Sequence, residues 1–104
     1  MNLHVFPRKV LLDLNNPVFQ EQLFNLPKAE QRSVLNTLKK LSKMTWQQVY
    51  TDHGLKWEAI LSREGPKGET LYSFRISKKV RAVGYREGDY LRLLTLHPDH
   101  DSAY

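Results

Sequence analysis

The sequence predicts an α+β domain in which an N-terminal strand and a helical hairpin pack on an antiparallel β-meander. Two observations carry this prediction. Apolar residues in the first half are spaced as in helices, whereas those from residue 55 onward alternate with a period of two. All five glycines fall between Gly54 and Gly88, where hairpin turns need them. We expect residues 1–104 to form a single domain, since domains commonly have ~100–150 residues.

The first half begins with an expected strand over residues 3–12, in which Pro7 marks an edge position or a bulge. The segment 15–17 (Asn-Asn-Pro) then has the composition of a helix start. A helical pattern runs from Val18 to about Lys43. Pro27 divides this pattern into two helices, because proline suits the first turn of a helix. The short connection predicts an antiparallel helical hairpin.

The second half predicts four sequential strands, at residues 55–61, 71–77, 80–86 and 90–96. The segments 63–68 and 87–89 separate strands with strong turn residues. We expect the helices to cover one face of this sheet and a cationic face opposite to stay open. Trp57 and Phe74 are predicted core residues, and Trp46 is expected to fill the gap between helix and sheet.

Composition narrows the function classes. Lys and Arg outnumber Asp and Glu by 16 to 11, which gives a net charge of +5 and favours a polyanionic partner. Cysteine is absent, which excludes disulfides, thiolate metal sites and a cysteine nucleophile. No phosphate-binding glycine loop or G-x-S-x-G motif is present. Without an apolar run of ~20 residues or a signal-peptide pattern, we expect a cytoplasmic protein.

The segment that contains His97 and His100 is the part of the chain most like a metal-binding sequence, because Asp99 and Asp101 accompany the two histidines. Pro98 prevents the helix that would align both imidazoles. No motif such as H-E-x-x-H supplies a third ligand. We therefore expect neither a metal nor another cofactor.

Cationic, imidazole and phenol groups are concentrated in the second half, at Lys56, Arg75, Lys78, Lys79, Arg81, Arg92, His100 and Tyr104. Metal-free RNA cleavage needs groups of this kind. A base deprotonates the 2′-hydroxyl, an acid protonates the leaving 5′-oxygen, and a cation stabilises the charged transition state. Histidine exchanges protons near neutral pH, and arginine offers a planar fork to phosphate oxygens.

Three stretches resemble the RelE/ParE superfamily of bacterial type II toxins, particularly its ribosome-dependent mRNA interferases. Residues 52–55 (Asp-His-Gly-Leu) resemble the D-H-x-L segment that enters the second strand in part of this branch. Residues 74–85 are similar to the family's R-I-x-x-x-x-R-hydrophobic run, and residues 100–104 resemble its closing H-x-x-x-[FY] segment. The order of strand, helical hairpin and meander also agrees.

The resemblance implies roles for individual residues. It assigns Arg81 to stabilisation of the scissile phosphate, His100 and Tyr104 to acid–base or base-stacking roles, and His53 to a supporting role. The cationic residues expected to bind RNA are Lys56, Arg75, Lys78 and Lys79. The implied partners are mRNA on the ribosome and a cognate antitoxin, encoded by a neighbouring gene, that wraps the toxin with a disordered segment.

Other interpretations stay open at this stage. The chain has Trp57 where relatives usually have glycine, and Glu58 follows Lys56 where some relatives carry a lysine pair. A non-catalytic interaction module of the same fold, resembling the gyrase-inhibiting branch or an inactivated toxin, is the alternative function. Locally, Arg75 is expected to brace the sheet by pairing with Glu58, and His53 to cap a turn.

Overall fold

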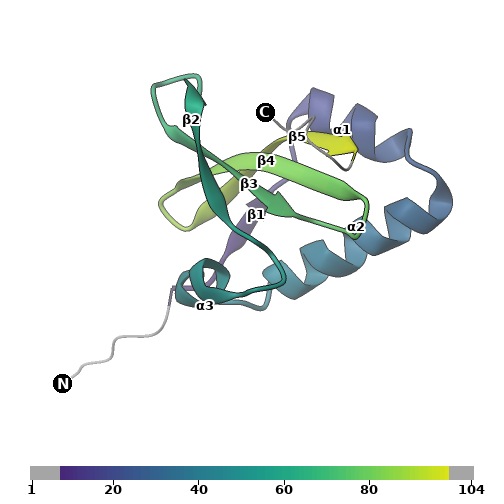
Figure 1. Cartoon of the computed structure of the whole chain (residues 1–104), viewed down its shortest axis with the longest axis horizontal. Helices are drawn as coiled ribbons and strands as arrows, with labels where there is room; N and C mark the ends of the chain where they lie inside the picture. The colour runs from purple at the N-terminus through teal and green to yellow at the C-terminus, as the bar shows by residue number, and fades with distance from the viewer. Residues whose placement is uncertain (1–7, 99–104) are drawn as a thin grey trace.

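The computed structural model describes residues 8–98 and contains a five-stranded sheet with three helices (Figure 1). The elements are β1 (Leu11–Asp13), α1 (Pro17–Phe24), α2 (Lys28–Leu41), α3 (Trp46–Thr51), β2 (Glu58–Glu64), β3 (Thr70–Arg75), β4 (Val80–Glu87) and β5 (Tyr90–Pro98). The strand order is β1-β5-β4-β3-β2, with antiparallel pairing from β2 to β5. The predicted α+β class, with its helical hairpin and meander, is confirmed.

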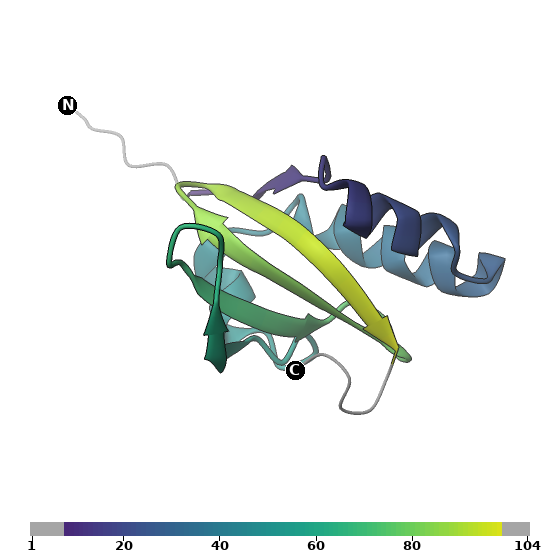
Figure 2. The same cartoon turned by 90° about the horizontal axis from the view of Figure 1, so that it is seen from above.

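The helical hairpin forms for the local reasons that the sequence indicated. The Asn16 side chain caps α1 by accepting hydrogen bonds from the backbone N–H groups of Val18 and Phe19. The amide of Gln31 on α2 donates to the carbonyls of Leu23 and Phe24 in the last turn of α1. Figure 2 shows the two helices side by side along one face of the sheet.

The short helix α3 was not predicted. Its signal in the sequence is a capping box, in which the Thr45 hydroxyl accepts from the Gln48 backbone N–H and the Gln48 side chain accepts from the Thr45 backbone N–H. The helix places Trp46 in the core, where its indole N–H donates to the carbonyl of Asp89 at 3.0 Å. Trp46 therefore fills the gap between helix and sheet, as expected.

The main core lies between the helices and the sheet. Its largest fully buried side chains include Phe19, Val34, Leu41, Phe74, Ile76 and Leu91. Trp57 closes one edge of this core, with its ring stacked on Phe74 and Tyr72 at centroid distances of 5.5 and 4.8 Å. Phe74 is thus a core residue as predicted, while Trp57 is half-buried.

The face opposite the helices is not open along its whole length, which corrects the sequence-based expectation. Ile60, Leu71, Val83 and Tyr85 are buried there as a second apolar cluster. The pairing of β2 with β3 becomes irregular between Ile60 and Glu64, and β2 crosses in front of the sheet in Figure 1. One half of this face is therefore covered by β2, and the cationic half lies beside it.

The first strand pairs in parallel with the last, from Leu11 beside Tyr90 to Asp13 beside Arg92. The expected strand over residues 3–12 is thus realised as 11–13, and residues 1–7 lie outside the described part. An ion pair between Asp13 and Arg92 fastens this edge, and Arg92 also bonds Glu87. Arg92, one of the cationic candidates, therefore has a structural role.

Acid is expected to weaken this edge. The Asn15 backbone N–H and the guanidinium of Arg92 hold the pKa of Asp13 below its usual value of 3.8, against the opposing effect of burial. A carboxyl whose pKa is lowered by folding contributes stability above its unfolded pKa and loses it as the pH falls. Melting temperatures measured below about pH 4 should therefore fall less steeply for Asp13→Asn than for the wild type. Parallel curves would contradict this role.

Candidate active site

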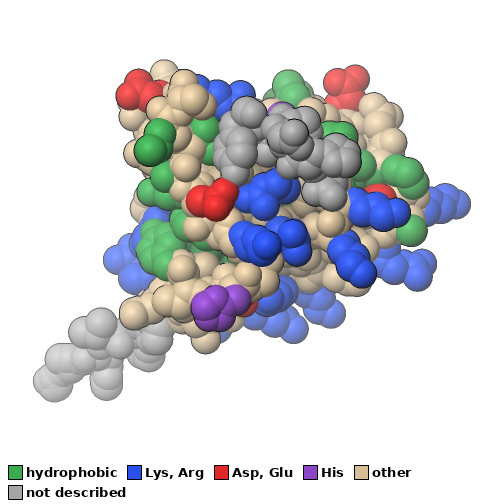
Figure 3. All heavy atoms as spheres, in the orientation of Figure 1, with side chains coloured by type: hydrophobic (Ala, Val, Ile, Leu, Met, Phe, Trp, Pro, Cys, Tyr) green, Lys and Arg blue, Asp and Glu red, His purple; other side chains and the backbone are tan. Residues whose placement is uncertain are grey.

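Three basic side chains form a row across neighbouring strands. Arg75 on β3 lies opposite Arg81 on β4, and Arg81 lies opposite His97 on β5. Their neighbours Phe74, Ala82 and Leu96 belong to the core on the helix side. Because side chains alternate along a strand, the row points to the other face. Figure 3 shows Lys and Arg side chains gathered over the middle of that face.

Arg81 is held in place while keeping unused donor capacity. Its side chain is 13% exposed, and its Nη2 donates to the hydroxyl of the fully buried Ser73 at 2.9 Å. The carbonyl of Lys56 lies 3.5 Å from the same nitrogen. Its Nε is buried and has no hydrogen-bond partner among residues 8–98. The buried Nε is closed to a ligand, but a rigidly held guanidinium is suited to bind a phosphate oxygen through its remaining N–H groups.

The ion pair expected between Arg75 and Glu58 is wrong. The Glu58 carboxylate lies 3.8 Å from Nη2 of Arg81. The exposed Arg75 side chain makes no ion pair within the described part of the chain. Glu58 lies opposite Ser73, two residues before Arg75 on β3, and therefore not directly opposite Arg75. Arg75 is left available to a ligand.

The turn into β2 places Lys56 and His53 beside this row. Lys56 has φ of 50°, a conformation that is unusual for a residue with a side chain. The Asp52 carboxylate caps the turn by accepting from the Leu55 backbone N–H at 3.0 Å. The predicted capping by His53 is therefore not the arrangement found. His53 is exposed and lines a hollow of about 690 Å³ with Lys56, Trp57 and Glu58.

The turn between β3 and β4 brings two further predicted cations to the same end of the sheet. Lys78 and Lys79 are exposed there, between the strand positions of Arg75 and Arg81. The next residue, Val80, pairs with Pro98. The structure therefore brings together Lys56, Arg75, Lys78, Lys79 and Arg81, with His53 at the margin.

His97 is a member of this row that we did not assign to the site from the sequence. Its Nε2 lies 2.9 Å from the hydroxyl of Thr95. Burial, with a further contribution from the positive charge of Arg63, lowers the pKa of His97 below 6.5. The imidazole is therefore neutral at pH 7, and a neutral imidazole can accept a proton.

A β-bulge explains why the sequence did not reveal His97. Near the hairpin turn Tyr85 lies opposite Arg92 and Gly84 opposite Leu93, but beyond this point Val83 lies opposite Thr95. The extra residue, Leu94, shifts the register by one. Counting outward from the turn without the bulge would place Leu96 opposite Arg81 and turn His97 to the other face.

The remaining predicted site residues, His100 and Tyr104, lie outside the described residues 8–98. Asp99 and Asp101, which accompany the two histidines of the metal-binding sequence considered above, also lie outside these residues. Among residues 8–98 no group of three or more His, Cys, Asp or Glu side chains is arranged to hold a metal ion. No helix in this range is long and apolar enough to cross a membrane.

The fold can be compared with those of known proteins. The structure is similar to that of the archaeal RelE–RelB complex from Pyrococcus horikoshii, with a TM-score of 0.58 and 20% sequence identity over 89% of this chain and 96% of the other. The chain has a RelE-like toxin fold. This finding confirms the fold that the three sequence stretches suggested.

A second solved structure also matches the chain. A copper-bound mutant toxin from Helicobacter pylori is 21% identical, with a TM-score of 0.46 over 92% of this chain and 98% of the other. No family model and no curated protein sequence matches the chain. The RelE-like toxin fold is thus recognisable in the backbone rather than in the overall sequence.

Proposed function

We propose that this protein is the toxin of a type II toxin–antitoxin system and cleaves mRNA on the ribosome without a metal ion. The observation that carries the proposal is the row of Arg75, Arg81 and His97 on the face of a RelE-like fold opposite the helices. A polyanion fits this row and the net charge of +5. A toxin of this kind acts in the cytoplasm.

The residues of this row and their neighbours can carry out different steps of the cleavage reaction. Arg81 binds the scissile phosphate and stabilises the charge of its transition state, while Arg75, Lys56, Lys78 and Lys79 hold the neighbouring phosphates. A base removes the proton of the 2′-hydroxyl, whose oxygen attacks phosphorus. The bond from phosphorus to the 5′-oxygen then breaks, and an acid protonates that oxygen.

Two described groups next to Arg81 can accept the proton. These are the neutral imidazole of His97 and the carboxylate of Glu58, which lies 3.8 Å from Arg81. His100 and Tyr104, which the resemblance assigned to proton transfer, follow His97 within a few residues. They are the proposed acid–base partners of Arg81, with His53 in a supporting role.

A protein partner belongs to the proposal. The similar archaeal RelE structure was determined as a complex with RelB. By this likeness, we propose that a cognate antitoxin encoded by a neighbouring gene binds and neutralises this chain. Co-purification of the two gene products, and rescue of growth by the second gene, would test this pairing.

The decisive experiment is inducible expression of an N-terminally tagged chain, with growth measured and mRNA 5′ ends mapped. An N-terminal tag keeps added residues away from His100 and Tyr104, the proposed acid–base partners of Arg81. We expect growth arrest and new mRNA ends. If growth and mRNA stay intact even with ribosomes present, the non-catalytic interaction module is the better description.

The pH dependence of cleavage should show whether His97 acts as the base. Because burial lowers the pKa of this imidazole, the base form persists below pH 6.5 and activity should decline only at more acidic pH. Below that pKa the rate of a one-base reaction falls about tenfold per pH unit. Cleavage measured between pH 5 and 8 should show this acidic limb in the wild type and lose it in His97→Gln. An unchanged limb in the variant would assign the base to another group.

A further inference from the structure

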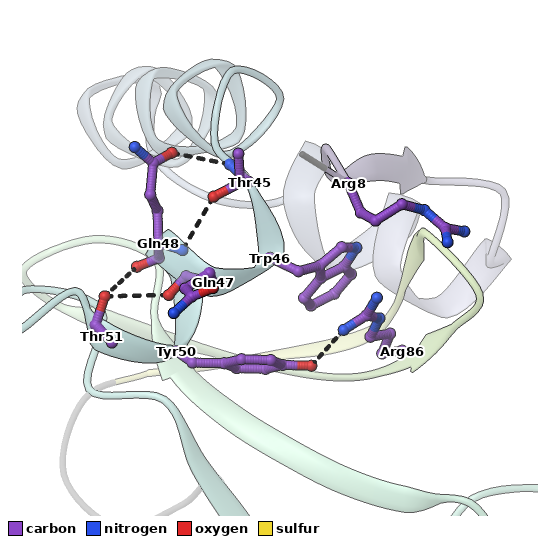
Figure 4. A pocket seen from close by; sticks show the side chains of 8 residues that line it. All are labelled: Arg8, Thr45, Trp46, Gln47, Gln48, Tyr50, Thr51 and Arg86. Atoms are coloured by element: carbon purple, nitrogen blue, oxygen red, sulfur yellow. Dashed lines mark hydrogen bonds between the residues drawn. The ribbon is translucent and has the colours of Figure 1, made fainter. Parts of the chain in front are cut away.

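A second concave surface lies on the other side of α3 from the candidate active site. This groove, of about 680 Å³, is formed by α3, the segment before β1 and the end of β4 (Figure 4). We call it the α3 groove. The lining residues that matter are Arg8, Trp46, Gln47, Tyr50, Thr51 and Arg86, and none of the described lining residues is acidic.

The groove presents a preorganised surface of aromatic rings with two arginines, Arg8 and Arg86, which both pair with the carboxylate of Asp89. The guanidinium of Arg86 lies 4.5 Å from the centre of the Trp46 ring and donates to the Tyr50 hydroxyl at 2.8 Å. It also donates to the Gly88 carbonyl at 2.7 Å. Trp46 is 2% exposed, whereas Tyr50 is 48% exposed. The Tyr50 ring is thus held in position and offered to solvent, where a planar ligand can stack on it.

The α3 groove adjoins the hollow beside the candidate active site. Tyr50 and Thr51 line both this groove and the hollow that contains His53, Lys56 and Glu58. Lys56 and Glu58 in turn lie next to Arg81. A ligand chain bound at Arg81 can therefore pass through the hollow, cross Tyr50 and enter the groove.

We infer that the α3 groove binds single-stranded RNA a few nucleotides away from the phosphate at Arg81, with a base stacked on Tyr50. Arginines beside exposed aromatic rings are the combination used for single-stranded nucleic acid, because phosphates need cations and bases need flat apolar surfaces. The inference rests on the proposed function, since it extends the RNA path from the candidate active site. An acidic peptide is the competing occupant, and the experiments below distinguish it.

The first experiment measures binding of a fluorescent single-stranded decanucleotide of 2′-O-methyl RNA, which lacks the nucleophile and stays intact. Tyr50→Ala should weaken binding by roughly 5- to 100-fold, the usual loss when a base-stacking ring is removed. Tyr50→Phe keeps the ring and should bind nearly as the wild type does.

Tyr90→Ala is the matched control. Tyr90 is 43% exposed and lies 5.1 Å from the guanidinium of Arg92, but it does not line the groove. This variant should bind RNA as the wild type does. Equal binding by Tyr50→Ala and the wild type would overturn the inference.

A pair of substitutions at Gln47 tests the groove without removing packing. Gln47 is exposed and its side-chain amide makes no hydrogen bond among residues 8–98. Gln47→Lys should strengthen RNA binding and Gln47→Glu should weaken it, each by about two- to fivefold at low salt, because the charge acts on nearby phosphate. Identical affinities in both variants would count against RNA in the groove.

Photocrosslinking locates the RNA directly. A decanucleotide carrying 5-iodouridine should crosslink to the tryptic peptide 44–56, which contains Trp46 and Tyr50. Crosslinks that all map elsewhere would overturn the inference while leaving the proposed function intact.

Competition with polyglutamate tests the acidic peptide as the occupant of the groove. If polyglutamate displaces no RNA, the peptide alternative fails. Selective binding of polyglutamate that Tyr50→Ala abolishes would replace RNA by an acidic partner. If the wild type binds no RNA at all, the inference fails, while the proposed function is decided separately by growth arrest and new mRNA ends.

Discussion

Replacing Arg81 with lysine should lower the rate of mRNA cleavage by about 10²- to 10³-fold, the usual effect of losing one donor to a charged transition state. The guanidinium has several donors, so it can bond the Ser73 hydroxyl at 2.9 Å and still bind a phosphate. A lysine ammonium is a single point charge that cannot reproduce this planar arrangement. RNA binding should change little, since the charge is retained. Single-turnover cleavage of ribosome-bound mRNA measures the effect.

Arg32→Lys is the matched control for this substitution. Arg32 is exposed on α2 and makes no ion pair within residues 8–98. The control should cleave at the wild-type rate. Arg81→Lys at full activity with an unchanged melting temperature would show that Arg81 does not act on the scissile phosphate.

Replacing Phe74 with alanine should destabilise the fold by about 3–5 kcal/mol, the usual cost of removing a fully buried phenyl ring. Phe74 is completely inaccessible to solvent and stacks on Trp57 at the edge of the core. Its loss leaves a cavity between the helices and β3, and domains of this size are stable by only about 5–15 kcal/mol. Urea denaturation followed by tryptophan fluorescence should show a much lower midpoint.

Phe24→Ala provides the comparison, because Phe24 is 69% exposed at the end of α1. Surface substitutions away from special features usually change stability by less than about 0.5 kcal/mol. A loss at Phe74 no larger than the loss at Phe24 would contradict the assignment of the main core.

Local patterns accounted for much of the fold. The helical spacing before residue 42, the Pro27 break and the alternation after residue 55 depend on neighbours in sequence. The helical hairpin and the four meander strands are found within a few residues of their predicted bounds. The Thr45–Gln48 capping box is equally local, so α3 was predictable and was overlooked. The parallel pairing of β1 with β5 joins residues far apart in sequence, and no local pattern indicates it.

The candidate site likewise has features that the sequence indicates and features that only the folded structure shows. The sequence by itself determined that cationic groups are concentrated in the second half of the chain, and the family resemblance singled out Arg81 among them. Only the tertiary structure decided that His97 lies beside Arg81, that Glu58 pairs with Arg81, and that Arg92 is held at the β1 edge. The physical reason is register. One extra residue, Leu94, reverses the face of every side chain beyond it, and the bulge is set by packing on both faces of the sheet.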